Sequence, residues 1–282
     1  MMRHFFLTIF CIVELTQSCV AVTLSEGDQQ ILRSFWKYAA DHQLTQLPVN
    51  EKIPIVAYFF IGTPYKSNTL FVTKENLPVI NLRELDCVTF VENVLALSFL
   101  DTYNDQSIET FIKNITRLRY RNGEIIDYTS RLHYSSDWLY EMQKQHLLTD
   151  VTSLCGGILH PMQIDYMSKN YTRYPVLTKD KSLLKKIKTI EATINQRTYY
   201  YIPKDQITAS CNQIKNGDIL LITTNIKGLD TSHLGFAWKD KGKTYLLHAS
   251  SDGKKVMISD LPLQEYMEGI KNQNGMMVAR KI

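Results

Sequence analysis

Cys87 is the first residue whose surroundings favour chemistry. It follows Asp86 at the start of residues 85–100, where apolar side chains recur at helical spacing. The Asp86 carboxylate is suited to cap this helix, because it can accept free amides of the first turn. Cys87 then occupies the first helical position, where unpaired amides and the helix dipole favour a thiolate and supply donors for an oxyanion. The alternative is a small buried side chain without chemistry, the commoner role of a free cysteine.

Two histidines lie on a predicted hairpin in the second half of the chain. Residues 231–250 contain two apolar strands, the first with His233 near its start and the second with His248 near its end. If the turn centres on Lys241-Gly242, His248 lies opposite Gly235. Both imidazoles then project from the same face of the sheet, so one can orient the other.

These three side chains predict a cysteine hydrolase. His233 would deprotonate Cys87, the thiolate would attack an amide carbonyl, and the imidazolium would protonate the leaving amine. His248 would fix the tautomer of His233, and water would hydrolyse the thioester. This chemistry needs no cofactor. A zinc enzyme using His233, His248 and Asp86 is the alternative, although the sequence has neither a His-Glu-x-x-His motif nor paired cysteines at ligand spacing.

The elements that must position these residues change in type along the chain. Residues 25–145 are mostly helical in pattern, with a helix predicted over 29–40 and another over 85–100. Strands predominate after Tyr199, and they are predicted over residues 199–202, 219–223, 234–238, 245–248 and 276–279. Helices followed by an antiparallel sheet predict an α+β fold. Residues 151–179 have little periodicity and indicate an insertion or binding loop.

Composition is that of a folded domain without a nucleic-acid partner. The chain has 282 residues, of which 44% are hydrophobic and 21% charged, and its formal net charge is +4. No repeat or long linker divides it, so residues 23–282 are predicted to form one domain. Basic residues are spread along the chain, and the lysines of 181–188 are typical of the solvated face of a helix. We expect a monomer.

The N-terminus resembles an export signal. Residues 1–22 have a short basic start, an apolar run and a small-residue end, as in a cleaved signal peptide. An acylated lipoprotein N-terminus at Cys19 is the alternative. No later segment has about 18 continuous apolar residues, so no membrane span is expected. The mature protein is therefore expected in the periplasm or outside the cell.

Export would leave an odd number of cysteines. Cys87, Cys155 and Cys211 remain after cleavage, so at least one thiol is unpaired. Cys155 and Cys211 are expected to be inert or bridged to each other. The remaining histidines, which lack ligand-like partners, are expected to be surface or structural residues: His133, His146 and His160.

Several segments together resemble the NlpC-type papain-like cysteine peptidases of bacterial cell walls. They are Asp-Cys at 86–87, Ser-His-Leu-Gly at 232–235, Leu-His-Ala-Ser at 247–250, Gly-Thr-Pro-Tyr at 62–65 and Asn-Gly-Asp-Ile-Leu at 216–220. The resemblance implies a papain-like core in which the cysteine helix packs on an antiparallel sheet. It also implies a triad of Cys87, His233 and His248. Tyr65 would line the site, and Asp86 and Ser232, which flank the triad, would contact substrate.

Departures from the common pattern indicate one branch of that superfamily. Val88 and Thr89 stand where common members have Ser-Gly, and the gap before His233 is long. With residues 131–138, these features resemble the N-acetylmuramoyl-L-alanine amidase-like branch, which implies peptidoglycan fragments as substrates and an enlarged insertion. Within 131–138, sugar-stacking rings and hydrogen-bonding groups are expected from Arg131, Tyr134, Ser136, Asp137 and Trp138. The alternative is that Tyr134 and Trp138, at i and i+4, form a packed stripe.

Other functions fit the same residues. A γ-D-glutamyl-diaminopimelate endopeptidase would use the same triad on a different bond. A secreted acyltransferase or effector would resolve the thioester with another acceptor. A non-catalytic wall-binding module would have no need for Cys87, His233 and His248 together.

Overall fold

The computed structural model describes residues 24–70 and 77–282, so the predicted signal peptide lies outside the described residues. The helices are α1 Glu26–Asp41, α2 Val49–Phe59, α3 Cys87–Ser98, α4 Ile108–Arg119, α5 Ser135–Lys144, α6 Tyr166–Lys169, α7 Pro175–Lys179, α8 Lys181–Ile194, α9 Ile207–Ser210 and α10 Leu263–Glu268. The strands are β1 Thr149–Asp150, β2 Ile158–Leu159, β3 Tyr200–Pro203, β4 Ile219–Thr224, β5 Thr231–Asp240, β6 Lys243–Ser250, β7 Lys255–Ile258 and β8 Gln273–Arg280. Within these ranges, no helix is both long enough and apolar enough to cross a bilayer.

One antiparallel sheet organises the second half of the chain. Its strand order is β2-β3-β8-β4-β5-β6-β7, and β1 pairs with β8 beside this path. The predicted α+β class with an antiparallel sheet is confirmed, as are the two predicted helices and the five predicted strands, within a few residues. The sequence analysis missed β7, which has only four residues and directly follows a turn.

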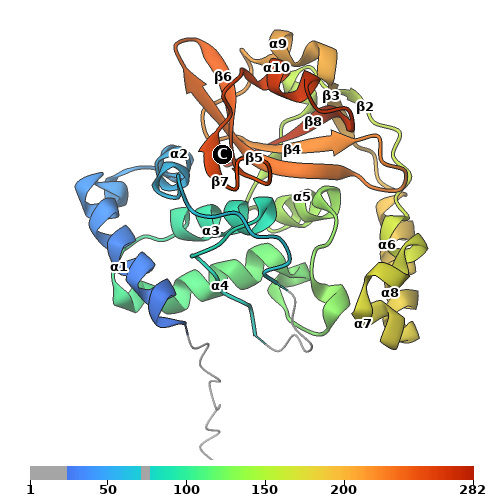
Figure 1. The fold of residues 1–282 in the computed structure, drawn as a ribbon, viewed down its shortest axis with the longest axis horizontal. Coiled ribbons are helices and arrows are strands. Elements are labelled where there is room, and N and C mark those ends of the chain that lie inside the picture. Colours follow the sequence, from blue (N-terminus) through green and yellow to red (C-terminus); the bar gives the residue numbers. More distant parts are fainter. Residues whose placement is uncertain (1–23, 71–76) are drawn as a thin grey trace, which may run out of the picture.

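Helices cover both faces of this sheet, with more and longer helices on one face than on the other. Figure 1 shows α1 to α5 beneath the sheet and the short α9 and α10 above it. Strand β4 is buried along its whole length. Ile219 and Leu221 belong to the large core shared with the lower helices, whereas Leu220 and Ile222 belong to a smaller core on the other face. This alternation follows from the two-residue period of a strand.

Helix α3 lies at the centre of the lower layer. Every residue from Thr89 to Ser98 is buried, because α2, α4 and strand β5 surround the helix. Phe90 packs edge-on against Phe236 of β5, with ring centroids 5.5 Å apart. A helix that is apolar on all sides is stable only when it is enclosed. The start of α3 is thereby held against the sheet.

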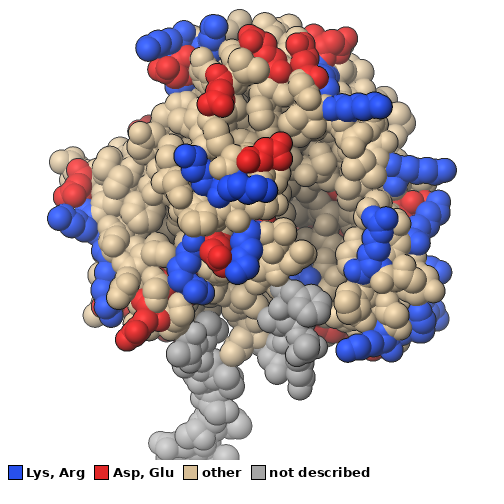
Figure 2. All heavy atoms as spheres, in the orientation of Figure 1, with Lys and Arg blue, Asp and Glu red and all other residues tan. Residues whose placement is uncertain are grey.

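Helices α6, α7 and α8 lie together on one side of the molecule (Figure 1). Residues 151–179 contain only short elements, including α6 and α7, in keeping with their weak periodicity. In α8, Leu184, Ile187 and Ile194 are buried while the lysines are exposed, so the predicted solvated helix face is confirmed. Basic and acidic side chains are interspersed over the face shown in Figure 2.

Candidate active site

The N-terminus of α3 is capped as predicted, in a way that leaves two amides for other partners. Asp86 Oδ1 accepts a hydrogen bond from the Thr89 amide at 2.8 Å, and Thr89 Oγ1 accepts one from the Asp86 amide at 2.9 Å. This reciprocal capping box satisfies two of the donors that begin a helix. The amides of Cys87 and Val88 also belong to the first turn, where no helical carbonyl is available to them.

The sulfur of Cys87 faces those amides and strand β5. Burial raises the pKa of the half-buried Cys87 thiol to about 12, and the Asp86 charge adds to this. Hydrogen bonds from the backbone amides of Leu234, Val88 and Cys87 itself lower the pKa but do not outweigh burial. The Leu234 contact places the sulfur beside the residue that follows His233. The thiol is therefore neutral at pH 7.

The two histidines of the hairpin are in direct contact. Nε2 of His233 lies 2.6 Å from Nδ1 of His248, with the two rings perpendicular. Strands β5 and β6 pair from Asp240↔Lys243 to Phe236↔Leu247, which is the predicted register. A Cβ atom on Gly235 would lie 3.0 Å from Cβ of His248, so the glycine permits the close approach of the two strands. The expected shared face of the imidazoles is confirmed.

This contact limits the hydrogen-bonding roles of the ring nitrogens. Nε2 of His233 is occupied by His248, which leaves Nδ1 of His233 for other partners. We infer that Nε2 of His233 carries hydrogen and donates to Nδ1 of His248, since only then is Nδ1 of His233 an acceptor. Burial lowers the pKa of His233 to about 4, and Asp252 opposes this shift. Burial, then the charge of His233, lowers the pKa of His248 to about 3. Both rings are therefore neutral at pH 7.

A buried carboxylate fixes the start of β5. Asp230 accepts hydrogen bonds from the amides of Ser136 and Thr231, both at 2.7 Å. The Thr231 hydroxyl also bonds the Ser135 hydroxyl at 2.6 Å. The strand is thus attached to the first turn of α5 immediately before His233. The sequence analysis missed Asp230, because its partner helix lies far away in the chain and no local spacing links the two.

Tyr65 lies beside the cysteine, where the resemblance placed it. Its amide donates to the Lys254 carbonyl at 2.9 Å, and the Leu85 amide donates to the Pro64 carbonyl at 2.9 Å. Residues 62–65 therefore run between β7 and the start of α3. Burial, followed by the nearby Cys87 and Asp86, raises the pKa of the Tyr65 hydroxyl. Ser232, next to His233, is exposed.

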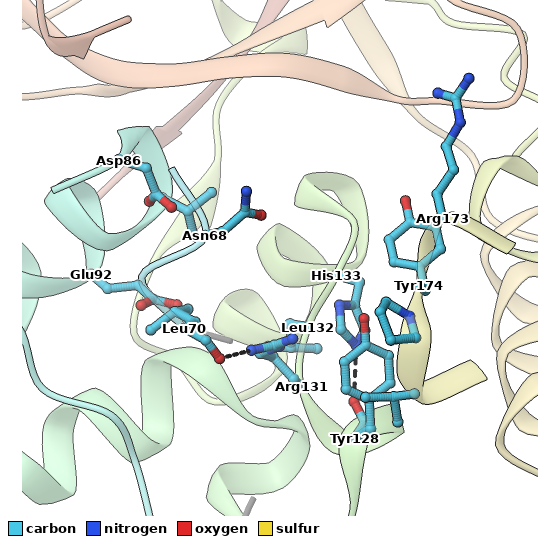
Figure 3. A pocket seen from close by; sticks show the side chains of 13 residues that line it. Asn68, Leu70, Asp86, Glu92, Tyr128, Arg131, Leu132, His133, Arg173 and Tyr174 are labelled. Carbon is cyan, nitrogen blue, oxygen red and sulfur yellow. Dashed lines mark hydrogen bonds between the residues drawn. The ribbon is translucent and has the colours of Figure 1, made fainter. Parts of the chain in front are cut away.

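A cleft of about 310 Å³ opens next to the cysteine. Asp86, Val88 and Glu92 of α3 form one wall, and the loop 128–133 forms a second. Residues 173–176, from the segment predicted as an insertion or binding loop, form a third. Figure 3 shows Asp86, Asn68 and Glu92 at one end, and His133, Tyr128, Tyr174 and Arg173 at the other, with Arg131 between them.

His133 and Glu92 line this cleft, although neither was predicted to be a site residue. His133 was expected to be surface or structural, but it lines the cleft and its Nε2 lies 2.9 Å from the Tyr128 carbonyl oxygen. Glu92 is 3% exposed and forms a buried ion pair with Arg119 at 2.7 Å. A glutamate within an otherwise apolar helix was a usable signal, because a buried charge needs a partner or a function.

Four of the five residues expected to contact sugar are buried and offer no surface to a ligand. Tyr134 is 2% exposed and its hydroxyl donates to Glu191 at 2.8 Å, while Trp138 Nε1 donates to the Leu118 carbonyl at 2.9 Å. Ser136 and Asp137 are equally buried, and Asp137 pairs with two arginines: Arg121 and Arg197. The packed alternative describes Tyr134 and Trp138, because their polar groups are satisfied inside the core. Arg131 does line the cleft.

The other cysteines and histidines lie away from this site. Cys155 and Cys211 are free thiols, so the predicted alternative of a bridge between them is wrong. His146 is exposed, and His160 stacks on Tyr201 at 4.2 Å. Among the described residues, no three His, Cys, Asp or Glu side chains are grouped to hold a metal ion.

Comparison with known proteins identifies relatives with this fold. An N-acetylmuramoyl-L-alanine amidase of Bacteroides uniformis superposes with a TM-score of 0.77 and 35% identity, covering 82% of this chain and 98% of that one. A Bacteroides fragilis protein described as a "putative xylanase" superposes with a TM-score of 0.75 and 37% sequence identity. The match covers 80% of this chain and 99% of that one. A Legionella pneumophila protein gives 0.67 at 24% identity, covering 90% and 95%, which shows a shared fold alone.

No curated protein matches the chain. The family model of AmiA-like proteins, described as N-acetylmuramoyl-L-alanine amidase-like, matches residues 55–276. This range contains Cys87, His233 and His248, together with the whole cleft. Because the match spans most of the chain, the protein belongs to the AmiA-like family of N-acetylmuramoyl-L-alanine amidase-like proteins.

Proposed function

We propose that the protein is a cysteine amidase with a papain-like, NlpC-type core. It hydrolyses the amide between N-acetylmuramic acid and L-alanine in peptidoglycan fragments. The observation that carries the proposal is the 2.6 Å contact between His233 and His248, next to the Leu234 amide that faces the Cys87 sulfur. The family and the Bacteroides uniformis amidase support the choice of bond.

The reaction begins with proton transfer from sulfur to nitrogen. Nδ1 of His233 takes the thiol proton of Cys87 as the sulfur attacks the carbonyl carbon. The new oxyanion accepts hydrogen bonds from the amides of Cys87 and Val88, which are fixed at the start of α3. His248 accepts the proton on Nε2 of His233 in a hydrogen bond and stabilises the imidazolium.

The second half of the reaction restores the resting state. The imidazolium of His233 gives its proton to the alanine nitrogen, the C–N bond breaks, and the acyl group stays on Cys87 as a thioester. A water molecule then attacks the thioester carbonyl while His233 removes one of its protons. The muramoyl carboxylic acid leaves, and the proton held by His233 returns to the sulfur.

The neutral resting pair fits this order of events. A thiol whose pKa is raised to about 12 and an imidazole whose pKa is lowered to about 4 do not form a stable ion pair before substrate arrives. Charge develops only as the sulfur attacks, when the amides and His248 can stabilise it. The predicted leader over residues 1–22 and a wall-derived substrate support a location in the periplasm or outside the cell, and we propose that the enzyme acts as a monomer.

Mass spectrometry of products tests the proposal. Residues 23–282, their Cys87→Ala variant and the matched Cys211→Ala variant are each incubated with a disaccharide-peptide fragment. Wild type and Cys211→Ala should release the intact stem peptide beginning at L-alanine, and Cys87→Ala should not. A Cys87-dependent cut after D-glutamate would identify the γ-D-glutamyl-diaminopimelate endopeptidase instead. Transfer of the acyl group to an added amine would indicate an acyltransferase, and product formation by Cys87→Ala would refute a cysteine enzyme.

A further inference from the structure

The histidine pair depends on how the ring of His248 is turned. In the tautomer inferred above, Nδ1 of His248 accepts the hydrogen on Nε2 of His233, and the two atoms lie 2.6 Å apart. The last torsion of a histidine side chain is broad and roughly two-fold, so it does not select one orientation of the ring by itself. A ring turned over would present a carbon in place of Nδ1, and His233 would lose its acceptor. The surroundings of His248 must therefore fix the ring.

The pair lies on the face of the sheet that α9 and α10 cover. Leu246 belongs to the smaller core on that face, and His248, two residues further along β6, points to the same side. His248 is 1% exposed, so its ring is enclosed there. Residues of these short helices, and not only those of α3, can therefore contact the pair.

Tyr266 of α10 is in contact with the His248 ring. The two ring centroids lie 5.3 Å apart at an interplanar angle of 72°, an edge-on arrangement that aromatic rings prefer. His233 meets His248 edge-on as well, with ring centroids 4.8 Å apart. His248 therefore has ring contacts both with its hydrogen-bond partner and with Tyr266. Because an edge-on contact is directional, it restrains the plane of the imidazole in a way that an aliphatic side chain does not.

The backbone around Tyr266 is attached to the strand that carries His248. The Tyr266 amide donates to the Pro262 carbonyl at 2.8 Å, and its ring packs against the smaller core. Ahead of α10, the Ser259 amide donates to the Leu246 carbonyl at 2.8 Å, and the Ser259 hydroxyl accepts from the Leu246 amide at 3.1 Å. The ring of Tyr266 is therefore held at a fixed place relative to β6.

The hydroxyl of Tyr266 lies near the reacting groups but is not itself a base. Burial, followed by the charges of Asp252 and Cys87, raises the pKa of this hydroxyl to about 12. The phenol therefore stays protonated and neutral at pH 7. This leaves the contact of its ring with His248 as the way in which Tyr266 can influence the reaction.

We infer that Tyr266 is a positioning residue of this active site: its ring holds the His248 imidazole in the orientation in which Nδ1 accepts from Nε2 of His233. Without that acceptor, hydrogen can move to Nδ1 of His233, which then cannot take the proton of Cys87. Tyr266 acts through His248 and not on the substrate. As far as activity is concerned, the inference rests on the proposed function.

Three variants test the role of the ring by steady-state kinetics. Tyr266→Leu removes the aromatic ring, Tyr266→Phe keeps it without the hydroxyl, and Tyr201→Leu removes a tyrosine that stacks on His160, away from the site. A wrong tautomer costs up to about 10⁴-fold in a triad, so partial loss of the orientation should lower kcat of Tyr266→Leu by about 10- to 100-fold. Its KM should stay within about twofold of wild type, and both rate constants of the other two variants within about threefold. A kcat for Tyr266→Leu within about twofold of wild type, or an equal loss in Tyr266→Phe, would overturn the inference.

Nitrogen NMR of isotope-labelled imidazoles separates this inference from the proposed function. In wild type both rings should carry hydrogen on Nε2, whereas His248 of Tyr266→Leu should populate both tautomers. This measurement needs no substrate, so its result stands even if wild type cuts a different bond or none. Identical His248 spectra in the two proteins would refute the positioning role and leave the proposed function intact. If Tyr266→Leu did not fold, Tyr266→Met, whose flexible side chain fills irregular gaps, would take its place.

Discussion

Helices α3 and α5 both direct their N-termini at strand β5, and the two ends are used differently. The first turn of α5 is occupied by the protein itself, because the Asp230 carboxylate accepts the Ser136 amide. The first turn of α3 is only partly occupied: its capping box satisfies Asp86 and Thr89, and the amides of Cys87 and Val88 face the sulfur. The unpaired amides of a helix N-terminus therefore attach strand β5 at α5, whereas at α3 they favour negative charge on a bound group.

The largest effect on activity should follow from removing His233, the proposed base. His233→Ala should reduce kcat/KM by about 10³- to 10⁴-fold, as for other members of a catalytic triad. The free energy of unfolding should also fall by about 1 to 3 kcal/mol, because Nδ1 of the buried His248 loses its partner. Steady-state kinetics with the muramoyl-peptide measures the loss. A His233→Ala enzyme within tenfold of wild type would remove His233 from the mechanism.

Removing the backbone N–H of Val88 should have a smaller effect on activity. Val88→Pro lacks the backbone donor, yet proline is tolerated in the first turn of a helix. We expect kcat to fall by about 10²-fold, as when one oxyanion donor is lost. Val88→Ala, which keeps the amide, should stay within a few-fold of wild type. Equal rates for the two variants would show that this amide does not face the oxyanion, and circular dichroism checks that α3 is retained.

Removing the Asp230 carboxylate from the N-terminus of α5 should affect stability more than activity. Asp230→Ala leaves the Ser136 and Thr231 amides without their acceptor in a buried place. The free energy of unfolding should fall by about 2 to 6 kcal/mol, since two donors lose their acceptor and each costs about 1 to 3 kcal/mol. Urea unfolding measures this change. If Asp230→Ala lost activity while its stability stayed at the wild-type value, the assignment of Asp230 to attachment alone would be wrong.

Acid should lower the stability of the folded protein through His233 and His248. The native pKa values of His233 and His248 are lowered to about 4 and about 3, whereas an unfolded imidazole titrates near 6.5. Below pH 6.5 the unfolded chain therefore binds more protons, so stability falls as the pH drops from about 6.5 towards 3. Each histidine contributes up to about 1.4 kcal/mol per pH unit. Unfolding of His248→Gln across this range should show a shallower slope, and an unchanged slope would contradict the shift.

The smallest effect concerns an exposed carboxylate near the pair. The charge of Asp252 raises the pKa of His233, against the larger effect of burial. Asp252→Asn should therefore move the acid limb of kcat/KM to lower pH by a few tenths of a unit, and salt should diminish the difference. Asp240→Asn, an exposed acid at the far end of β5, is the control. A shift to higher pH would reverse the assigned sign.

The parts of this site that were predictable depend on residues close together in the sequence. Asp86 and Thr89 form a cap within a few residues of Cys87, and a two-residue turn sets the register that brings His248 to His233. Such patterns have few structural solutions, so the sequence alone sufficed. The same reasoning predicted the antiparallel sheet, because its strands alternate with clear turn residues.

The parts that were missed depend on distant partners. Tyr134 and Trp138 recur at i and i+4 whether a helix faces a ligand or a core, and only the packing of Glu191 and Leu118 decides between them. Asp230 meets its helix across a long stretch of chain. Residues 173–176 have no periodicity, so nothing local placed them on the wall of the cleft.

The separation of Cys87 from the histidine hairpin makes activity a late event in folding. The hairpin that pairs His233 with His248 is local and can form early, but the sulfur meets Leu234 only after α3 has docked on the sheet. Contacts so distant in sequence form slowly. In an unfolded or half-assembled chain the thiol and the histidine pair are thus apart. Recovery of hydrolysis during refolding would report completion of the core, not formation of its helices and strands.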